Sequence, residues 1–246
     1  MKKVVFLGSK PIGLFCLNYI SEKSKEYKID ILAVFSNENS TFGGGSFKEL
    51  CDSKGIPFYT DIQNLSEIKE PIDYLISIQF HQILNKNHLN HARIRAVNLH
   101  MAPVPEYRGC NQFSFAIYNK EDTFGTTLHI MNEGIDSGDI IAEKRFNIHS
   151  GITVEELLEL TVKESMSLFS ENFSVIFDQK RELTPQIGPS RTYYRKDIAK
   201  LKEIKLQDSE DEIDLKMRSS FMPGFKPPYI IIKDKKYYLI PEKHLK

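Results

Sequence analysis

The sequence lacks a charge excess of either sign, because Lys and Arg together number 33 and Asp and Glu also number 33. Proteins that bind tRNA or DNA usually carry a basic excess, so this balance argues against a nucleic-acid partner, although it leaves a local basic patch open. No apolar stretch approaches the roughly 18 residues of a membrane span. The apolar run after Met1 breaks at Ser9-Lys10-Pro11 without a signal-peptide cleavage site. We therefore expect a cytoplasmic protein without a membrane partner.

Cysteine is also scarce. The three cysteines, Cys16, Cys51 and Cys110, lie far apart and form no C-x-x-C spacing. This pattern excludes a disulfide framework and argues against a structural zinc site, and no other cluster of metal ligands is visible, so we expect no metal. Cys16 and Cys51 are expected in the core. Cys110 follows Arg108-Gly109, and burial suits it better than use as a nucleophile.

Short β-branched runs alternate with helical patterns at the start of the chain. The run from Lys3 to Leu7, the helical pattern after it and the run from Ile29 to Phe35 predict a β-α-β unit with a right-handed crossover. The turn G-S-K-P-I-G lacks the dinucleotide-binding spacing G-x-G-x-x-G, and Gly43-Gly44-Gly45 lacks the Lys-Ser/Thr ending of a P-loop. The sequence therefore predicts an α/β fold with a mainly parallel sheet and no dinucleotide site of that type.

The remaining elements fall into a main domain and a small tail. Further strands are predicted at 56–59, 72–78, 95–99, 125–132 and 140–146. Thr153 and Glu156 form a capping box that opens a long amphipathic helix reaching Phe177. After Leu183 come a linker, a short helix capped by Ser209 and two strands joined at Asp234-Lys235. We therefore divide the chain into 1–183 and 184–246, and expect the tail to pack on the main domain or on a second subunit, because about 60 residues alone build a weak core.

Polar side chains gather where the predicted strands end. Asn98 and His100 lie two residues apart at the end of one strand, so their side chains share a face. Gln79-Phe80-His81 follows the preceding strand and should lie at the same carboxyl edge, where open α/β folds bind ligands. Asp136 lies in the loop of a predicted hairpin. An amide, an imidazole and a carboxylate together suggest chemistry by positioning and proton transfer.

The segment from Val97 to Ala142 resembles the signature of the folate-dependent formyltransferases. That signature has an N-x-H strand end, an L-P-x-Y-R-G-like loop and a G-[IL]-D-[ST]-G-D turn, which read here N-L-H at 98–100, V-P-E-Y-R-G at 104–109 and G-I-D-S-G-D at 134–139. Val104 stands where the family prefers leucine. The resemblance extends over residues 1–180 and implies a Rossmann-like formyltransferase domain that uses N10-formyltetrahydrofolate as co-substrate.

By this resemblance, Asn98, His100 and Asp136 are the catalytic residues. An amine that attacks a formyl carbon creates an oxyanion, to which the Asn98 amide can donate. His100 can take the proton of the amine, while Asp136 can orient the imidazole, favour its charged form and help relay the proton to N10. The pterin is expected beside Gln79, Phe80, His81, Ile135 and Asp136, although His81 is equally well explained as a surface residue. His129 is expected to be packed or hydrogen-bonded rather than catalytic.

The tail resembles that of the sugar N-formyltransferases. It contains a T-Y-Y-R linker at 192–195 and a P-G-F-K-P-P-Y segment at 223–229. A methionyl-tRNA enzyme would be expected to carry a full C-terminal barrel, a glycinamide ribonucleotide enzyme to stop near the long helix, and a hydrolase to begin with a regulatory domain. The resemblance thus implies an amino-deoxy sugar carried on a nucleotide, in surface polysaccharide or O-antigen synthesis. We expect a dTDP-linked sugar, such as dTDP-4-amino-4,6-dideoxyglucose or a 3-amino isomer.

Aromatic rings can stack on a base and guanidinium groups can pair with a pyrophosphate. The candidates for gripping the nucleotide are Arg108, Tyr193, Tyr194, Phe225 and Tyr229. For each of them, hydrophobic anchoring of the tail is an equal alternative. The tail is also expected to form a homodimer interface. Formylation of another small amine, such as glycinamide ribonucleotide, and an inactive binding protein both stay open.

Overall fold

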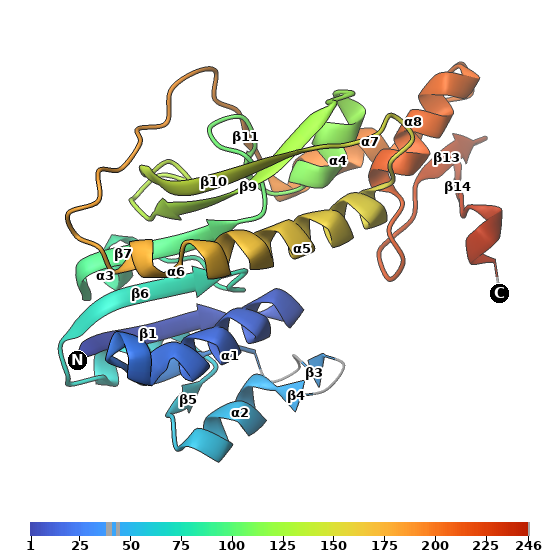
Figure 1. Ribbon diagram of the computed structural model, residues 1–246. Coiled ribbons are helices and arrows are strands. Elements are labelled where there is room, and N and C mark those ends of the chain that lie inside the picture. Colours follow the sequence, from blue (N-terminus) through green and yellow to red (C-terminus); the bar gives the residue numbers. More distant parts are fainter. Residues whose placement is uncertain (38–40, 43–44, 246) are drawn as a thin grey trace. The chain divides into compact units, whose positions relative to one another are not determined.

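The computed structural model describes residues 1–37, 41–42 and 45–245, so the predicted loop at Gly43 and Gly44 lies outside the described residues. The chain, traced in Figure 1, forms two compact units that are each built from several segments. Unit 1 comprises Met1–Met101, Thr126–Lys144 and Glu164–Ile187, and unit 2 comprises Ala102–Gly125, Arg145–Lys163 and Gly188–Lys246. The sequence division at 183/184 stays a prediction, and each unit is described by itself.

A seven-stranded sheet in the order β10-β9-β7-β6-β1-β2-β5 organises unit 1. Its strands are β1 (Lys2–Gly8), β2 (Ile29–Phe35), β5 (Phe58–Tyr59), β6 (Ile72–Ile78), β7 (Ala92–His100), β9 (Thr123–Ile130) and β10 (Ile140–Asn147). Neighbours from β5 to β7 run parallel, and β9 runs antiparallel to β7. The predicted α/β class with a mainly parallel sheet is confirmed, with β5 shorter and β7 longer than predicted.

One face of the sheet is covered by α1 (Lys10–Tyr27), the end of α5 (Val154–Glu171) and α6 (Phe173–Ile176). Figure 1 shows α1 lying along β1. Tyr19 of α1 packs edge-on against Phe173, with ring centroids 5.3 Å apart. The predicted single helix to Phe177 is wrong in one respect. It breaks at Asn172, which leaves helical geometry at φ −109° and ψ 13° and donates from its side chain to the Leu168 carbonyl.

The opposite face of the sheet packs on the 3-10 helix η1 (Ile62–Glu67), whose Ile62 and Leu65 join the alternate residues Val5 and Leu7 of β1 in one apolar cluster. Two further short helices, α2 (Phe47–Lys54) and α3 (Lys86–Leu89), and the strand pair β3 (Thr41–Phe42) and β4 (Gly45–Ser46) complete unit 1.

Two cysteines of unit 1, Cys16 in α1 and Cys51 in α2, are buried as predicted. Burial raises the pKa of the Cys16 thiol well above its usual value and the pKa of the Cys51 thiol to about 12. Since a thiolate is the reactive form of cysteine, both thiols are chemically inert packing groups.

Unit 2 gathers the tail around the helix α4 (Gln112–Tyr118). Tyr193, Leu201 and Leu215 of the tail share an apolar cluster with Phe115 and Ile117 of α4, so the expected packing of the tail on other parts of the chain is confirmed. The tail elements are β11 (Thr192–Tyr193), η2 (Arg195–Asp197), α7 (Ile198–Lys202), β12 (Glu203–Ile204), α8 (Glu210–Ser220), β13 (Tyr229–Ile232), β14 (Lys235–Tyr238) and η3 (Glu242–His244).

Two details of the tail follow from local sequence chemistry. Ser209 caps α8 as predicted, because its hydroxyl accepts from the Glu212 N–H. The two final strands join at Lys233-Asp234, one residue earlier than predicted. Both turn residues have positive φ, 48° and 62°, which is the geometry of a type I′ hairpin.

Candidate active site

The candidate site lies entirely in unit 1, at the carboxyl edge of β6 and β7. The parallel register of β6 and β7 pairs Ser77 with Asn98 and Ile78 with Leu99. His100 and Gln79 therefore come next at this edge. The antiparallel register with β9 places His129 opposite Asn98. Three strands therefore deliver polar groups to one place.

Asp136 contacts both other predicted catalytic residues. Its Oδ2 lies 3.6 Å from His100 Nδ1, and its Oδ1 lies 3.5 Å from Asn98 Nδ2. His100 is 5% exposed, and its carbonyl accepts a hydrogen bond from Thr126 Oγ1 at 3.0 Å. The structure thus brings together all three predicted catalytic residues. The contacts are long for hydrogen bonds, and catalytic hydrogen bonds of this kind tighten when a substrate is engaged.

A second histidine belongs to the same cluster. His129 is 1% exposed, and its Nε2 lies 3.5 Å from Asp136 Oδ1 and 3.3 Å from Asn98 Nδ2. Its Nδ1 lies 2.8 Å from the Ile130 carbonyl oxygen. Because a carbonyl only accepts, Nδ1 carries a proton, while Nε2 faces both the Asn98 amide and the Asp136 carboxylate. The predicted hydrogen-bonded role of His129 is confirmed. The sequence did not show that this histidine belongs to the site, where it contacts both Asn98 and Asp136.

The loop between β9 and β10 holds Asp136 in an unusual backbone conformation. Its φ is +44°, in the left-handed region, which Asp adopts more readily than most residues. Within the loop, Asn132 Oδ1 accepts from the Gly134 N–H at 3.0 Å and from Ser137 Oγ at 2.7 Å. A Cβ on Gly138 would lie 2.0 Å from the Ile130 carbonyl oxygen, so this position admits only glycine without movement of the loop.

The residues predicted to hold the folate lie at this edge but make their own contacts. Gln79 has φ +52° and accepts a hydrogen bond from Lys10 Nζ at 3.2 Å. His81 is exposed, as its alternative interpretation foresaw; its Nδ1 lies 3.4 Å from Ser9 Oγ and its ring meets Phe80 edge-on. Ile135, next to Asp136, is 49% exposed, which leaves its apolar side chain available to a ligand.

The five residues predicted to grip the nucleotide all lie in unit 2. Tyr193 is buried and its ring stacks on Phe115 at 4.2 Å and on Tyr107 at 5.5 Å. Its hydroxyl accepts from Asn119 Nδ2 at 3.0 Å. Both ring faces are covered, so stacking on a base is the wrong role for Tyr193, and the alternative of anchoring the tail is the right one.

The other four candidates are less buried than Tyr193. Tyr194 and Phe225 are 52% and 67% exposed. Arg108 lies in the two-residue strand β8 (Arg108–Gly109), which pairs with β11. Tyr229 begins β13, and the Lys236 ammonium lies 3.7 Å from its ring centroid. Tyr194 and Phe225 are therefore the rings that a planar ligand could reach most easily.

Cys110, expected to be buried, is exposed. Its backbone N–H donates to the Tyr193 carbonyl at 2.8 Å, which fixes the chain while the side chain points outward. Among the residues that the structure describes, no group of three or more His, Cys, Asp or Glu residues could hold a metal ion. Within the same residues, no helix is both long and apolar enough to cross a membrane.

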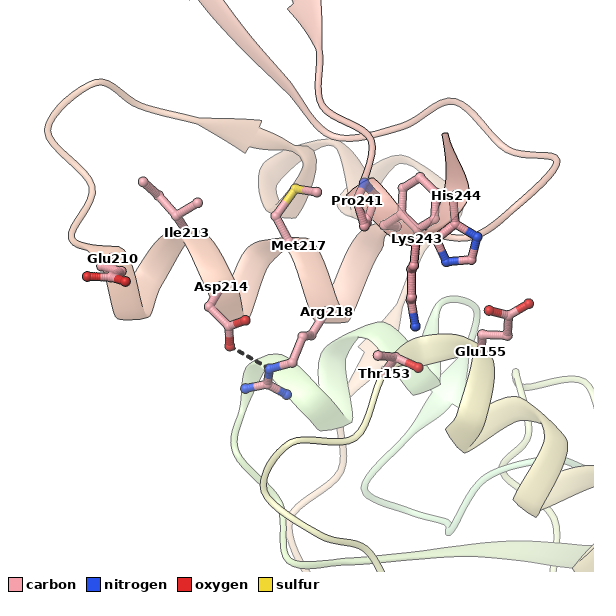
Figure 2. A pocket seen from close by; sticks show the side chains of 11 residues that line it. Thr153, Glu155, Glu210, Ile213, Asp214, Met217, Arg218, Pro241, Lys243 and His244 are labelled. Atoms are coloured by element: carbon pink, nitrogen blue, oxygen red, sulfur yellow. Dashed lines mark hydrogen bonds and ion pairs between the residues drawn. The ribbon is translucent and has the colours of Figure 1, made fainter. Parts of the chain in front are cut away.

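A pocket of about 390 Å³ in unit 2 is separate from this chemistry. Ile213 and Met217 of α8 and Phe221 just after it line this pocket together with residues at the start of α5 and in η3. Figure 2 shows Asp214 reaching toward Arg218, which donates to it from Nε at 2.7 Å. None of the three predicted catalytic residues contributes to its lining.

Comparison with known proteins identifies the family to which this chain belongs. The sequence pattern of the family described as "Formyl transferase" matches residues 2–172. Methionyl-tRNA formyltransferase of Clostridioides difficile is 31% identical over 188 residues, which cover 69% of this chain and 60% of that protein. GDP-perosamine N-formyltransferase of Brucella melitensis is 28% identical over 232 residues, which cover 92% of this chain and 87% of that protein.

A solved structure agrees in fold. The N-formyltransferase from Helicobacter canadensis, in complex with folinic acid and dTDP-3-aminofucose, superposes with a TM-score of 0.74 at 23% identity and covers 95% of this chain and 85% of that one. The fold is therefore that of a formyltransferase with a Rossmann-like sheet. The chain belongs to the formyl transferase family, and it spans about 60% of the length of the methionyl-tRNA formyltransferase relative.

Proposed function

We propose that the protein transfers a formyl group from N10-formyltetrahydrofolate to the amine of a nucleotide-linked amino sugar. The observation that carries the proposal is the partly buried cluster of an amide, an imidazole and a carboxylate, Asn98, His100 and Asp136, with Asp136 in contact with both others. The match along 92% of this chain to a sugar N-formyltransferase supports the acceptor class, since that match includes the tail.

The chemistry of the described groups suits a formylated folate. Polar groups of Gln79 and exposed apolar surface on Ile135 lie at the sheet edge beside the cluster, and we propose that they contact the pterin together with Phe80, His81 and the backbone at Asp136. When bound, N10-formyltetrahydrofolate supplies the formyl group and leaves as tetrahydrofolate after N10 accepts a proton. The Helicobacter enzyme binds folinic acid, a formylated folate, which supports this co-substrate.

Each cluster residue has a distinct part in formyl transfer. Because Nδ1 of His100 faces Asp136, Nε2 is the nitrogen that takes the proton of the attacking amine. Asn98 Nδ2 carries two hydrogens and lies 3.3 Å from His129 Nε2 and 3.5 Å from Asp136 Oδ1; the hydrogen that faces Asp136 turns to the formyl oxygen as that oxygen gains negative charge. Asp136 orients the imidazole and relays a proton toward N10. The new C–N bond forms at the amine while the bond to N10 breaks.

The residues proposed to bind the nucleotide belong to unit 2. We propose that Tyr194 and Phe225, whose rings are half or more exposed, stack on the base, and that Arg108 and Tyr229 bind the phosphates or the sugar. A dTDP-linked 4-amino- or 3-amino-6-deoxy sugar is our preferred acceptor, supported by the dTDP-3-aminofucose in the Helicobacter complex. The Brucella relative acts on GDP-perosamine by its name, so the base needs a direct test.

The test is a formylation assay with N10-formyltetrahydrofolate across dTDP-, UDP- and GDP-linked amino sugars, with glycinamide ribonucleotide and methionyl-tRNA as competing acceptors. We expect turnover with at least one amino-sugar nucleotide and the highest kcat/KM with a dTDP sugar. Turnover restricted to glycinamide ribonucleotide or methionyl-tRNA would refute the sugar acceptor. Turnover with a GDP sugar alone would refute only the preferred base.

We also propose a homodimer through the tail. Apolar side chains in and just after the final hairpin are about half exposed, namely Ile231, Ile232, Tyr237, Tyr238 and Ile240, and β14 is an edge strand of its three-stranded sheet. An exposed apolar edge of this kind is typical of an interface between chains. Light scattering should give a dimer that becomes monomeric in Ile232→Lys. Location in the cytoplasm and a role in surface polysaccharide or O-antigen synthesis are part of the same proposal.

A further inference from the structure

The loop that carries the carboxylate of the candidate site is strained at Asp136 and closely packed at Gly138. Asp136 has a φ of +44°, and Gly138 lies so close to the Ile130 carbonyl that no side chain fits there. The contacts from Asn132 to Gly134 and Ser137 close the exposed start of the loop. They do not involve the backbone carbonyls at 136 and 138, which face a different segment of the chain.

That segment is 184–187, which follows α6 and ends unit 1. Thr184 and Ile140 exchange two backbone hydrogen bonds, from Ile140 N–H to the Thr184 carbonyl at 2.8 Å and from Thr184 N–H to the Ile140 carbonyl at 3.0 Å. Two residues further on, Gln186 Nε2 donates to the Asp136 carbonyl at 2.9 Å and to the Gly138 carbonyl at 2.7 Å.

We propose that Gln186 is a positioning residue that holds the Asp136 carboxylate against His100 and Asn98. This inference rests on the formyl-transfer role proposed for Asp136. The amide nitrogen of Gln186 has two hydrogens and meets two carbonyl oxygens on either side of Ser137, so a single side chain fixes the loop at two points. The bridge at Thr184 fixes the backbone from which Gln186 extends.

The two hydrogen bonds from Gln186 to the carbonyls of Asp136 and Gly138 can be removed by substitutions that lack an N–H donor. Methionine has nearly the same length and shape as glutamine but no N–H donor. Glutamate keeps the length and places an acceptor-only carboxylate against the two carbonyl oxygens, which repels them. Gln63, in η1 at an exposed position of the same unit, provides a matched control for a Gln→Met change.

The first readout is the separation of kcat from KM in steady-state formylation. Misplacement of a catalytic group by about 1 Å can cost about 10²-fold, so we expect Gln186→Met to lower kcat by about 10- to 100-fold with KM for the amino-sugar nucleotide within about threefold. Gln186→Glu should lose more, and Gln63→Met should match the wild type. A Gln186→Met kcat equal to that of the wild type overturns the proposal. So does a raised KM with an unchanged kcat, because Gln186 would then bind substrate.

The second readout does not depend on the acceptor. His100 and His129 both touch Asp136, so displacement of the carboxylate changes the ¹⁵N resonances of their rings. We expect these resonances, assigned by substitution of each histidine, to shift in Gln186→Met and to stay in place in Gln63→Met. Unshifted resonances overturn the positioning role. Failure of the wild type to formylate any amino-sugar nucleotide would instead refute the proposed function and leave this test intact.

Discussion

Replacing Gly138 by alanine would place a methyl group where the structure has no room for one. The new Cβ would lie 2.0 Å from the Ile130 carbonyl oxygen and 2.8 Å from its carbon. Non-bonded Cβ contacts stay above 3.0 Å, so the loop or the end of β9 must move by about 1 Å. Asp136 is two residues away on the same loop, and a displacement of about 1 Å from reacting groups costs about 10²-fold in rate.

We therefore expect Gly138→Ala to lower kcat by about 10²-fold with little change in folding, because the loop is largely exposed. Gly151→Ala is the matched control, since its Cβ would meet nothing closer than 3.7 Å. The assay is steady-state formylation together with the thermal midpoint of both variants. A Gly138→Ala enzyme with wild-type kcat would refute the argument that the loop fixes the carboxylate. Loss of the folded state would show instead that the strain spreads into the sheet.

Further outcomes follow from other parts of the site and the tail. His100→Ala should lower kcat by about 10²–10⁴-fold and Asn98→Ala by about 10²–10³-fold, with thermal midpoints near that of the wild type; unchanged rates would contradict their assigned roles. Tyr193→Ala should lower the free energy of unfolding by about 3–5 kcal/mol in a denaturant titration, whereas an unchanged midpoint would contradict its anchoring role. Hydrogen bonds from the Lys205 N–H and the Lys216 ammonium lower the pKa of Asp208. The stability that they confer is therefore present above the unfolded pKa of about 3.9 and lost as the pH falls through the lower folded value. The thermal midpoint of Asp208→Asn should thus change less with pH in the acid range than that of the wild type, and equal slopes would contradict this.

The sequence predicted the central part of the fold because its signals are local. Alternating β-branched runs and helical periodicity marked the strands of the parallel sheet, and the spacing of Asn98 and His100 placed both on one face at a strand end. Capping chemistry marked the helix starts at Thr153 and Ser209, and the structure has both.

Features that depend on tertiary packing were missed or misjudged. His129 looked like an ordinary strand histidine, because only the register of β9 on β7 brings it to Asn98. Tyr193 looked like a ligand-stacking ring, because the sequence does not reveal that Phe115 and Tyr107 cover its faces. Gln186 stands in a proline-containing linker with no signal of its own, and it acquires meaning only through the bridge between Thr184 and Ile140. In each case the deciding partner is at least ten residues away along the chain.

The central claim, that the cluster of Asn98, His100 and Asp136 moves a formyl group onto a sugar amine, is tested most directly by following the formyl carbon. The enzyme would be supplied with N10-formyltetrahydrofolate carrying ¹³C in the formyl group and with an amino-sugar nucleotide, and the label would be traced by ¹³C NMR. We predict that a formamide resonance on the sugar grows in with the wild type and grows in about 10²–10⁴-fold more slowly with His100→Ala. Label recovered only as free formate, or formamide formed equally well without His100, would contradict the account.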